Sequence, residues 1–298
     1  MFRFHIDKVD MNVDSSHTKL IKLVGNNKKV LEVGCSTGYV SKVLKEEFRC
    51  AVTGIEIATD AAKEAEKYCS STIVGDVEVM DFSEELGEDK FDVITFGDVL
   101  EHLKDPGKVL TALRAFLNDD GYVLASIPNI AHISVALELL EGKFDYRPHG
   151  ILDDSHIRFF TKKTIFSLFK GAGYEVTFLD RVIIKPEDTE FQTVLEKYPI
   201  SLLSFFGAES EAQTYQFIVK AVPSENKSEE ALQKEAEKTV LEELRNRIEE
   251  QELFIRELKK KEAVKEAVLT SMTNSWSWRI TAPLRWLYEK VMTRKSPK

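Results

Sequence analysis

The sequence predicts an α/β protein with a mostly parallel β-sheet. Short apolar, β-branched runs alternate with helix-like segments across residues 1–222, and this alternation is typical of βαβ units. A glycine-containing turn joins the first run to a helical pattern, and two longer strand-like runs close the region. The expected strands cover residues 29–34, 51–57, 71–76, 91–97 and 121–128, and the expected helices residues 16–24, 39–48, 59–68, 106–117 and 161–172.

The two longer runs cover residues 174–184 and 214–222. A segment that contains proline separates them, and we expect no clean helix in it. Strands that follow one another without a crossover helix pair as antiparallel neighbours. The sequence therefore predicts a closing hairpin at one edge of the sheet.

Composition and charge exclude several classes of protein. The chain has 298 residues, a net charge of -9 and three cysteines without C-x-x-C spacing, which argues against a disulfide framework or a zinc site. The body of the chain is acidic, which disfavours nucleic-acid binding and favours a small or neutral substrate. The N-terminus lacks an apolar signal segment, and no run reaches the length of a membrane span. We therefore expect a cytoplasmic protein.

Residues 223–270 are rich in Glu, Lys, Gln, Ala and Leu. Apolar residues in 241–258 keep a spacing of three and four, which predicts a long helix or a short coiled coil and a possible route to a homo-oligomer. A single solvated helix without a partner is the alternative.

The first strand runs into the turn VLEVGCSTG, in which Gly34 and Gly38 let the backbone bend and a ligand approach closely. Glu56 ends the second strand, where a carboxylate can accept hydrogen bonds from ribose hydroxyls. Asp76 ends the third strand, where it can accept from an adenine amino group. The carboxyl ends of parallel strands share one edge, so these residues predict a nucleotide site.

VLEVGCSTG, GIEI, GDVE and FDVITFGDVLEHLKDP resemble the ordered motifs of class I S-adenosylmethionine-dependent methyltransferases, in the branch similar to ubiquinone-pathway methyltransferases. The resemblance implies a methyltransferase domain over residues 1–222, with a Rossmann-like seven-stranded sheet whose last strand is antiparallel, and S-adenosylmethionine as cofactor. Ser36 departs from the family, which often has a glycine there. The implied cofactor-binding residues are Glu32, Gly34, Cys35, Ser36, Gly38, Glu56, Ile57, Asp76, Val77, Gly97 and Asp98.

Two other functions share parts of this pattern. A dehydrogenase would have G-x-G-x-x-G spacing, which residues 34–38 do not fit, and no P-loop lysine follows them. A methyltransferase-like scaffold that works through its coiled coil is the alternative from a different class.

A hydroxyl acceptor needs a base, which we expect after the fourth and fifth strands. His156 is the preferred base, with Asp154 to orient it, and His102 and Asp98 are the other candidates. Glu101 is expected to be structural. The predicted substrate-binding residues are Asn129, His149, Asp154 and Arg158, of which Arg158 would hold an anionic or hydroxyl-rich acceptor.

Two further readings of these residues stay open. Residues 148–161 could be a polar loop held by Arg–Asp pairing. Asp98 and Asn129 could share a magnesium ion, although the sequence predicts no dedicated metal site.

Residues 271–298 combine three tryptophans with six basic residues and one acid. Such segments favour an anionic membrane surface or a groove on a partner. The stretch SWSWRITAPLR resembles C-terminal segments of bacterial glycosyltransferases and methyltransferases of surface-polysaccharide assembly. This likeness implies, as acceptor, a sugar hydroxyl of a nucleotide-linked, lipid-linked or growing glycan, and contact with the inner membrane face or with a glycosyltransferase. A phenol or quinone precursor is the alternative acceptor.

Overall fold

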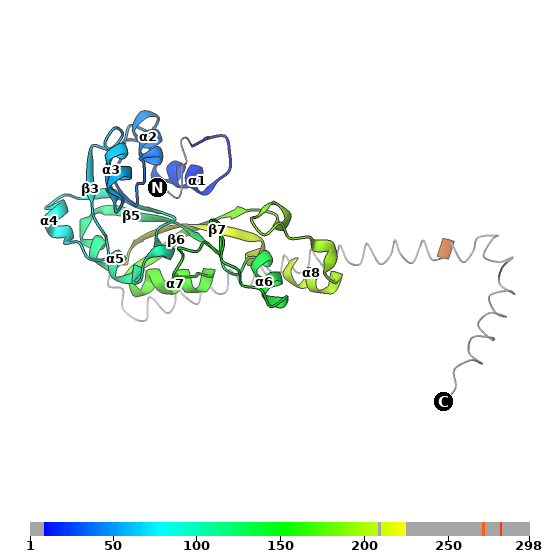
Figure 1. The fold of residues 1–298 in the computed structure, drawn as a ribbon. Helices are drawn as coiled ribbons and strands as arrows, with labels where there is room; N and C mark the ends of the chain where they lie inside the picture. The colour runs from blue at the N-terminus through cyan, green and yellow to red at the C-terminus, as the bar shows by residue number, and fades with distance from the viewer. Residues whose placement is uncertain (1–8, 208–209, 225–269, 272–280, 282–298) are drawn as a thin grey trace. The chain divides into compact units, whose positions relative to one another are not determined.

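The computed structural model describes residues 9–207, 210–224, 270–271 and 281. The chain divides into two compact units, Met1–Lys227 and Ser228–Lys298. The fold below is that of the first unit (Figure 1). The predicted coiled coil, its oligomer contact at 241–258 and nearly all of the predicted tail lie outside the described residues.

A seven-stranded sheet forms the centre of the first unit, in the order β3-β2-β1-β4-β5-β7-β6. The first five strands run parallel, and β7 pairs antiparallel with both β5 and β6. The predicted seven-stranded sheet with an antiparallel last strand and an edge hairpin is therefore confirmed. The strands are β1 (Lys29–Val33), β2 (Ala51–Glu56), β3 (Ser71–Val74), β4 (Phe91–Gly97), β5 (Leu117–Pro128), β6 (Tyr174–Ile183) and β7 (Thr214–Pro223).

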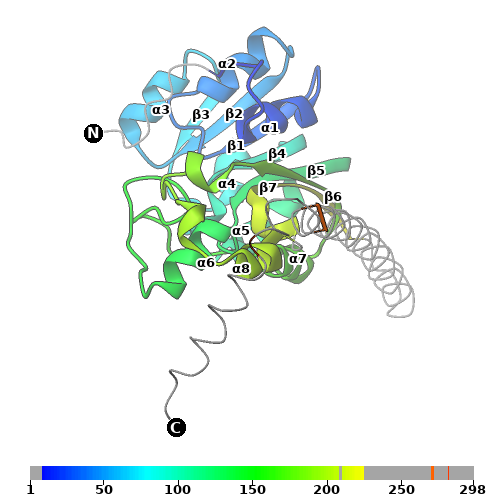
Figure 2. The same cartoon turned by 90° about the vertical axis from the view of Figure 1, so that its right-hand side faces the viewer.

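Helices cover both faces of the sheet, with α1, α2 and α3 on one face and α5 and α7 on the other (Figures 1 and 2). Ser15 caps α1 and Thr161 caps α7, in each case through a hydroxyl that accepts a backbone N–H of the first turn. The helices are α1 (Ser16–Val24), α2 (Tyr39–Glu46), α3 (Thr59–Ala65), α4 (Phe82–Leu86), α5 (Pro106–Leu113), α6 (Ile133–Leu140), α7 (Lys162–Gly171) and α8 (Ile200–Gly207).

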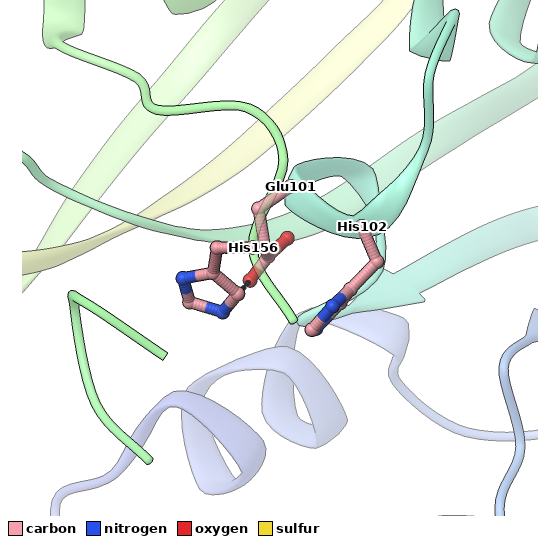
Figure 3. Close-up of side chains that lie close together, drawn as sticks. All are labelled: Glu101, His102 and His156. Carbon is pink, nitrogen blue, oxygen red and sulfur yellow. Dashed lines mark ion pairs between the residues drawn. The ribbon is translucent and has the colours of Figure 1, made fainter. Parts of the chain in front are cut away.

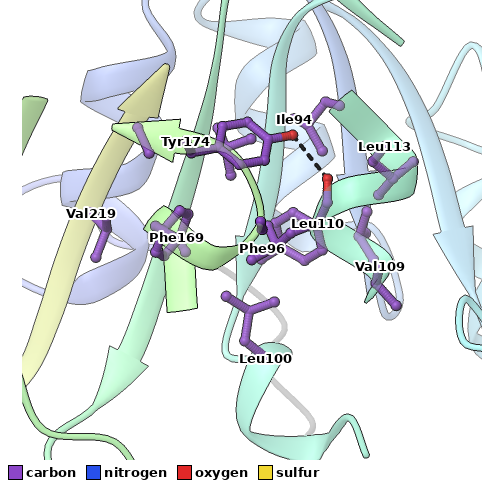
Figure 4. Close-up of a cluster of buried hydrophobic side chains, with 14 of the residues drawn as sticks. Ile94, Phe96, Leu100, Val109, Leu110, Leu113, Phe169, Tyr174 and Val219 are labelled. Atoms are coloured by element: carbon purple, nitrogen blue, oxygen red, sulfur yellow. Dashed lines mark hydrogen bonds between the residues drawn. The ribbon is translucent and has the colours of Figure 1, made fainter. Parts of the chain in front are cut away.

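Alternation along the central strands divides the core between these two helical layers. Val30 packs with α1 and α2, whereas its neighbour Leu31 packs with the α5 and α7 layer. In that second layer Phe169 and Tyr174 are buried, and the Tyr174 hydroxyl donates to the Leu110 carbonyl at 3.0 Å (Figure 4). The sheet is thus buried on both faces, which leaves its strand ends as the exposed places for a site.

Two insertions follow β5 and β6, and both contain helices that the sequence did not predict. The first, residues 129–161, carries α6; the second, residues 184–213, carries α8 and short 3-10 turns, contrary to the expectation of no helix there. Glu190 joins them, because its carboxylate accepts the backbone N–H of Ile151 at 2.6 Å and the hydroxyl of Tyr215 at 2.8 Å. Within the described ranges, no helix is long and apolar enough to span a membrane.

Candidate active site

The turn after β1 is shaped by Gly34, whose φ is +73°. A Cβ on Gly34 would lie 2.6 Å from Cγ2 of Val99, so the position needs glycine for its conformation and for space. Ser36 also has a positive φ, +49°, a conformation that glycine adopts more easily than serine. The backbone of this turn faces a cavity at the carboxyl ends of β1, β2 and β4.

Glu56 is fixed at that edge by two backbone donors. Its Oε2 accepts the N–H of Ser36 at 2.8 Å, and its Oε1 accepts the N–H of Ala58 at 2.9 Å. Asp76, after β3, accepts the N–H of Glu78 at 2.9 Å. Both carboxylates line the cavity, as the sequence predicts for groups that bind ribose and adenine.

The cavity has a volume of about 920 Å³ and is strongly acidic. Among the described residues that line it, none is a lysine or an arginine. The acidic side chains in its lining are Glu56, Asp60, Asp76, Glu78, Asp98, Glu101 and Asp153. Such a lining favours a ligand that carries positive charge or none.

Most of the predicted cofactor residues lie in this lining, but Glu32, Cys35 and Gly38 are not part of it. Glu32 is buried under the turn and accepts a hydrogen bond from the Ser41 hydroxyl. Burial raises the pKa of Glu32 to about 8, although the Ser41 bond opposes the shift. The predicted residues in the lining are Gly34, Ser36, Glu56, Ile57, Asp76, Val77, Gly97, Asp98, His102 and His156.

Asp98 directly follows β4 with a φ of +55°. Its Oδ1 accepts the hydroxyl of Ser126 at 2.8 Å and also the side-chain amide of Gln216. These contacts tie Asp98 to β5 and β7, so its carboxylate is held in one orientation at the cavity wall.

Glu101, His102 and His156 also line the cavity and lie close together (Figure 3). The carbonyl of Glu101 accepts the N–H groups of Ile157 and Arg158, both at 3.0 Å. These two bonds bring residues that are far apart in the sequence together. One carboxylate oxygen and one ring nitrogen from each histidine lie within 4.8 Å of one another.

Glu101 is only 1% exposed, and neither of its carboxylate oxygens has a hydrogen-bond partner among the described residues. Nε2 of His156 lies 4.0 Å from its Oε1. Burial, with a contribution from the charge of Asp98, raises the pKa of Glu101 well above its usual value. Glu101, which the sequence analysis expects to be structural, is in the cavity lining, and its role stays a prediction. The sequence signal that could have pointed to Glu101 as a cavity residue is its place directly before His102, in the turn at the end of a predicted strand.

The residue predicted to orient His156 is also different. Asp154 is exposed, whereas Asp153 is buried and lines the cavity. His156 is oriented by the carbonyl of Ile151, 3.0 Å from its Nδ1. Burial lowers the pKa of His156, so its imidazole is neutral near pH 7.

Three of the predicted substrate-binding residues, Asn129, His149 and Arg158, do not line the cavity. Asn129 is buried outside the lining, where its Nδ2 donates to the carbonyls of Glu211 and Thr214, both at 2.8 Å. Its Oδ1 accepts the N–H of Ala131 at 3.1 Å, so the side chain holds loops together and does not face Asp98.

Nε and Nη2 of Arg158 donate to the carbonyl of Lys104, at 3.1 and 2.5 Å. His149 is exposed, and neither Arg158 nor His149 lines the cavity. Neither residue is placed to bind an acceptor inside the cavity. The arginine predicted to hold an anionic acceptor instead fastens the loop after Glu101.

The family model for a methyltransferase domain matches residues 12–179. The chain belongs to this methyltransferase family. The predicted enzyme class and the predicted cofactor, S-adenosylmethionine, are thereby confirmed at the level of the family.

Curated relatives of this methyltransferase include ubiquinone biosynthesis O-methyltransferases. The protein from Glaesserella parasuis is 32% identical over 109 residues, which are 34% of this chain and 46% of the relative. The protein from Neisseria meningitidis serogroup A is 28% identical over 158 residues, 50% of this chain and 64% of the relative. The aligned part thus spans between about half and two thirds of these relatives.

Solved structures of similar shape include two methyltransferases. Magnesium protoporphyrin IX methyltransferase from Synechocystis, with bound S-adenosylhomocysteine, has a TM-score of 0.47 and 15% identity, over 74% of this chain and 91% of that one. An S-adenosylmethionine-dependent methyltransferase from Mesorhizobium loti has a TM-score of 0.46 and 13% identity, over 70% of this chain and 98% of that one.

Proposed function

We propose that the chain is an S-adenosylmethionine-dependent O-methyltransferase that acts on a hydroxyl group of a small acceptor. The observation that supports this most is an acidic cavity whose lining includes both the Gly34 turn with Glu56 and the group Glu101, His102 and His156. Its volume of about 920 Å³ suits a cofactor and a small acceptor together.

The residues of the turn fit the cofactor. Gly34 lines the cavity with its backbone alone, and the two anchored oxygens of Glu56 can accept hydrogen bonds from a ribose. Asp76 and Val77 would contact the adenine. The absence of basic side chains among the described lining residues favours a sulfonium, which is a cation.

When bound, S-adenosylmethionine supplies a methyl group on a positively charged sulfur: the carbon–sulfur bond breaks, a carbon–oxygen bond forms, and the hydroxyl proton leaves. The chain's main contribution is to align the acceptor oxygen with that methyl group. Asp98, His102 and His156 are the proposed catalytic residues, because each can present an unprotonated oxygen or nitrogen that orients the hydroxyl or accepts its proton.

The C-terminal segment indicates a sugar hydroxyl as the acceptor. We propose that such a sugar carries no phosphate group. A nucleotide-linked or pyrophosphate-linked precursor would bring negative charge into a cavity with seven acidic side chains, which opposes binding. A phenol or quinone precursor is the second candidate, and the O-methyltransferase relatives favour it.

The test uses the full chain with methyl-labelled S-adenosylmethionine and a bacterial lysate divided into glycan, lipid and small-molecule fractions. We expect label as an O-methyl group in the small-molecule fraction, and we expect Glu56→Ala to remove it. Label found only in phosphate-linked glycans would contradict the proposed acceptor class. Label in no fraction would contradict the enzymatic proposal.

A further inference from the structure

The three cysteines of the chain, Cys35, Cys50 and Cys69, are all buried and free. Two of them lie close together beside β2. A Cβ on Gly54, within that strand, would lie 2.6 Å from Sγ of Cys35 and 3.0 Å from Sγ of Cys69. Both sulfur atoms are therefore within 3.0 Å of one point, which makes them direct neighbours.

The topology of the sheet brings these two cysteines together. β2 lies between β1 and β3 (Figure 2), and Gly54 pairs with Glu32 on one side and with Thr72 on the other. Cys35 comes two residues after β1, and Cys69 comes two residues before β3. Because Gly54 has no side chain, the two thiols meet beside this strand, and any larger residue there would displace them.

Cys35 belongs to the turn that we propose binds the cofactor. Its neighbours Gly34 and Ser36 both line the cavity, whereas Cys35 itself is 1% exposed and is not part of the lining. Its backbone is fixed in the turn, because its N–H donates to the carbonyl of Ile55 at 3.1 Å and its carbonyl accepts the N–H of Gly38 at 2.9 Å. A covalent bond at the Cys35 sulfur therefore pulls on the backbone that borders the cavity.

We propose that Cys35 and Cys69 form a reversible disulfide bond when the chain reacts with a hydroperoxide, and that this bond lowers the affinity for the cofactor. The effect on the cofactor rests on the proposed function, whereas the formation of the disulfide does not. The spacing of the cysteines argues against a structural disulfide framework, and a transient bond between two neighbouring thiols is compatible with that.

Cys69 is the cysteine that we expect to react first. It is 7% exposed, against 1% for Cys35, and the exposed Ser70 follows it. Hydrogen bonding with Cys35 lowers the pKa of the Cys69 thiol, although burial opposes the shift. A lowered pKa favours the thiolate, which is the reactive form of cysteine.

The reaction has two steps. The Cys69 thiolate attacks one oxygen of the hydroperoxide, the O–O bond breaks, and the other oxygen leaves and takes up the proton that the thiol lost. Cys69 is then a sulfenic acid. The Cys35 sulfur attacks the Cys69 sulfur, the S–O bond breaks, and hydroxide leaves with the Cys35 proton as water. The two thiols lose two electrons and two protons, and hydrogen peroxide becomes two molecules of water.

Cys50 is a matched control within the chain. Its exposure of 6% is close to that of Cys69, but its Sγ donates to the carbonyl of Gly25 at 3.3 Å, away from Gly54. If exposure alone decided which thiol is oxidised, Cys50 would react as readily as Cys69. The proposal instead expects Cys50 to stay a free thiol, because no second cysteine lies beside it to complete a disulfide.

The test treats the full chain with hydrogen peroxide, alkylates the remaining thiols and maps the peptides by mass spectrometry. We expect the loss of two thiols, a linked pair of peptides that contain Cys35 and Cys69, and alkylation at Cys50. Dithiothreitol should restore all three thiols. In a calorimetric titration, S-adenosylhomocysteine should bind the oxidised chain at least about tenfold more weakly than the reduced chain, because the turn is displaced.

Two serine variants separate the disulfide from general oxidation. Cys69→Ser should bind S-adenosylhomocysteine equally well before and after peroxide treatment, because no thiol pair remains beside Gly54. Cys50→Ser should lose affinity on treatment as the original chain does. Circular dichroism of the reduced variants shows that they are folded, and the peptide map of the original chain tests the disulfide without any variant.

Three results would overturn the inference: no linked Cys35–Cys69 peptide after treatment, a disulfide that includes Cys50, or equal affinity of the oxidised and reduced chains for S-adenosylhomocysteine. A reduced chain that does not bind S-adenosylhomocysteine would instead count against the proposed function, and the peptide map would still decide whether the disulfide forms.

Discussion

Two parts of the cavity lining are built in different ways. The part that we propose binds the cofactor consists of turns that directly follow β1, β2 and β3, and backbone N–H groups two to twenty residues away fix its carboxylates. The part that we propose faces the acceptor is assembled from η1 (Leu100–His102) after β4 and a loop more than fifty residues later, joined through the carbonyl of Glu101. We call the first part, which is local in sequence, the local end, and the second, which depends on tertiary contacts, the tertiary end.

The largest expected effect tests the local end. Gly34→Ala places a Cβ 2.6 Å from Val99 in a left-handed conformation, so it should lower the free energy of unfolding by about 2–5 kcal/mol and cofactor affinity about 100-fold. Chemical denaturation and calorimetry measure these quantities.

Gly25→Ala is the matched control. Gly25 has a similar φ of +76°, but a Cβ there meets nothing within 4 Å, and the residue lies outside the cavity. The control should cost about 1 kcal/mol of stability and leave cofactor affinity unchanged. If both variants bind cofactor equally, the close approach at Gly34 does not matter for binding.

The second prediction concerns the tertiary end. His102→Ala and His156→Ala should each lower kcat/KM at least about tenfold, since each removes a group that we propose contacts the acceptor. If the histidines hold the acceptor, the loss appears mainly as a higher KM; if one of them is the base, it appears in kcat. His149→Ala is the control, and an equally small effect of all three variants would exclude a role for the imidazoles.

This contrast explains which parts were predictable from sequence. Strand periodicity, the glycine turn and the acids at strand ends are local patterns, and they gave the sheet, Glu56 and Asp76 in their observed places. The loop after β5 has few local constraints. The sequence analysis therefore chose Asp154 as the acid beside His156, whereas the neighbouring Asp153 is the one that lines the cavity. The carbonyl of the buried Glu101 accepts backbone N–H groups from residues 157 and 158, and no sequence period encodes such a contact.

A third, smaller effect is expected at a residue that the sequence placed in the substrate site. Asn129→Ala leaves two carbonyl acceptors, of which that of Thr214 is buried, and one N–H donor without their partner, and should lower stability by about 2–4 kcal/mol. The KM for the acceptor should stay within about twofold of the original, because the side chain does not line the cavity. A large rise in KM at unchanged stability would restore Asn129 to the substrate site.

The smallest effect concerns Glu32 and pH. Its pKa is about 8 in the folded chain and about 4.5 when unfolded, so folding takes up a proton between these values. Stability therefore falls as pH rises from about 4.5 to about 8 and changes no further above that. Glu32→Gln lacks this proton uptake, so its melting temperature relative to the original chain should be higher at pH 9 than at pH 5. A difference that is independent of pH would contradict the assigned shift.

Binding of S-adenosylhomocysteine tests most directly whether one acidic cavity holds the cofactor at the Gly34 turn. A calorimetric titration of the full chain should give saturable one-to-one binding, and Glu56→Ala, which removes a carboxylate held by two backbone N–H groups, should weaken it about 100-fold. No heat at about 1 mM ligand, or equal affinity of both proteins, would contradict the account.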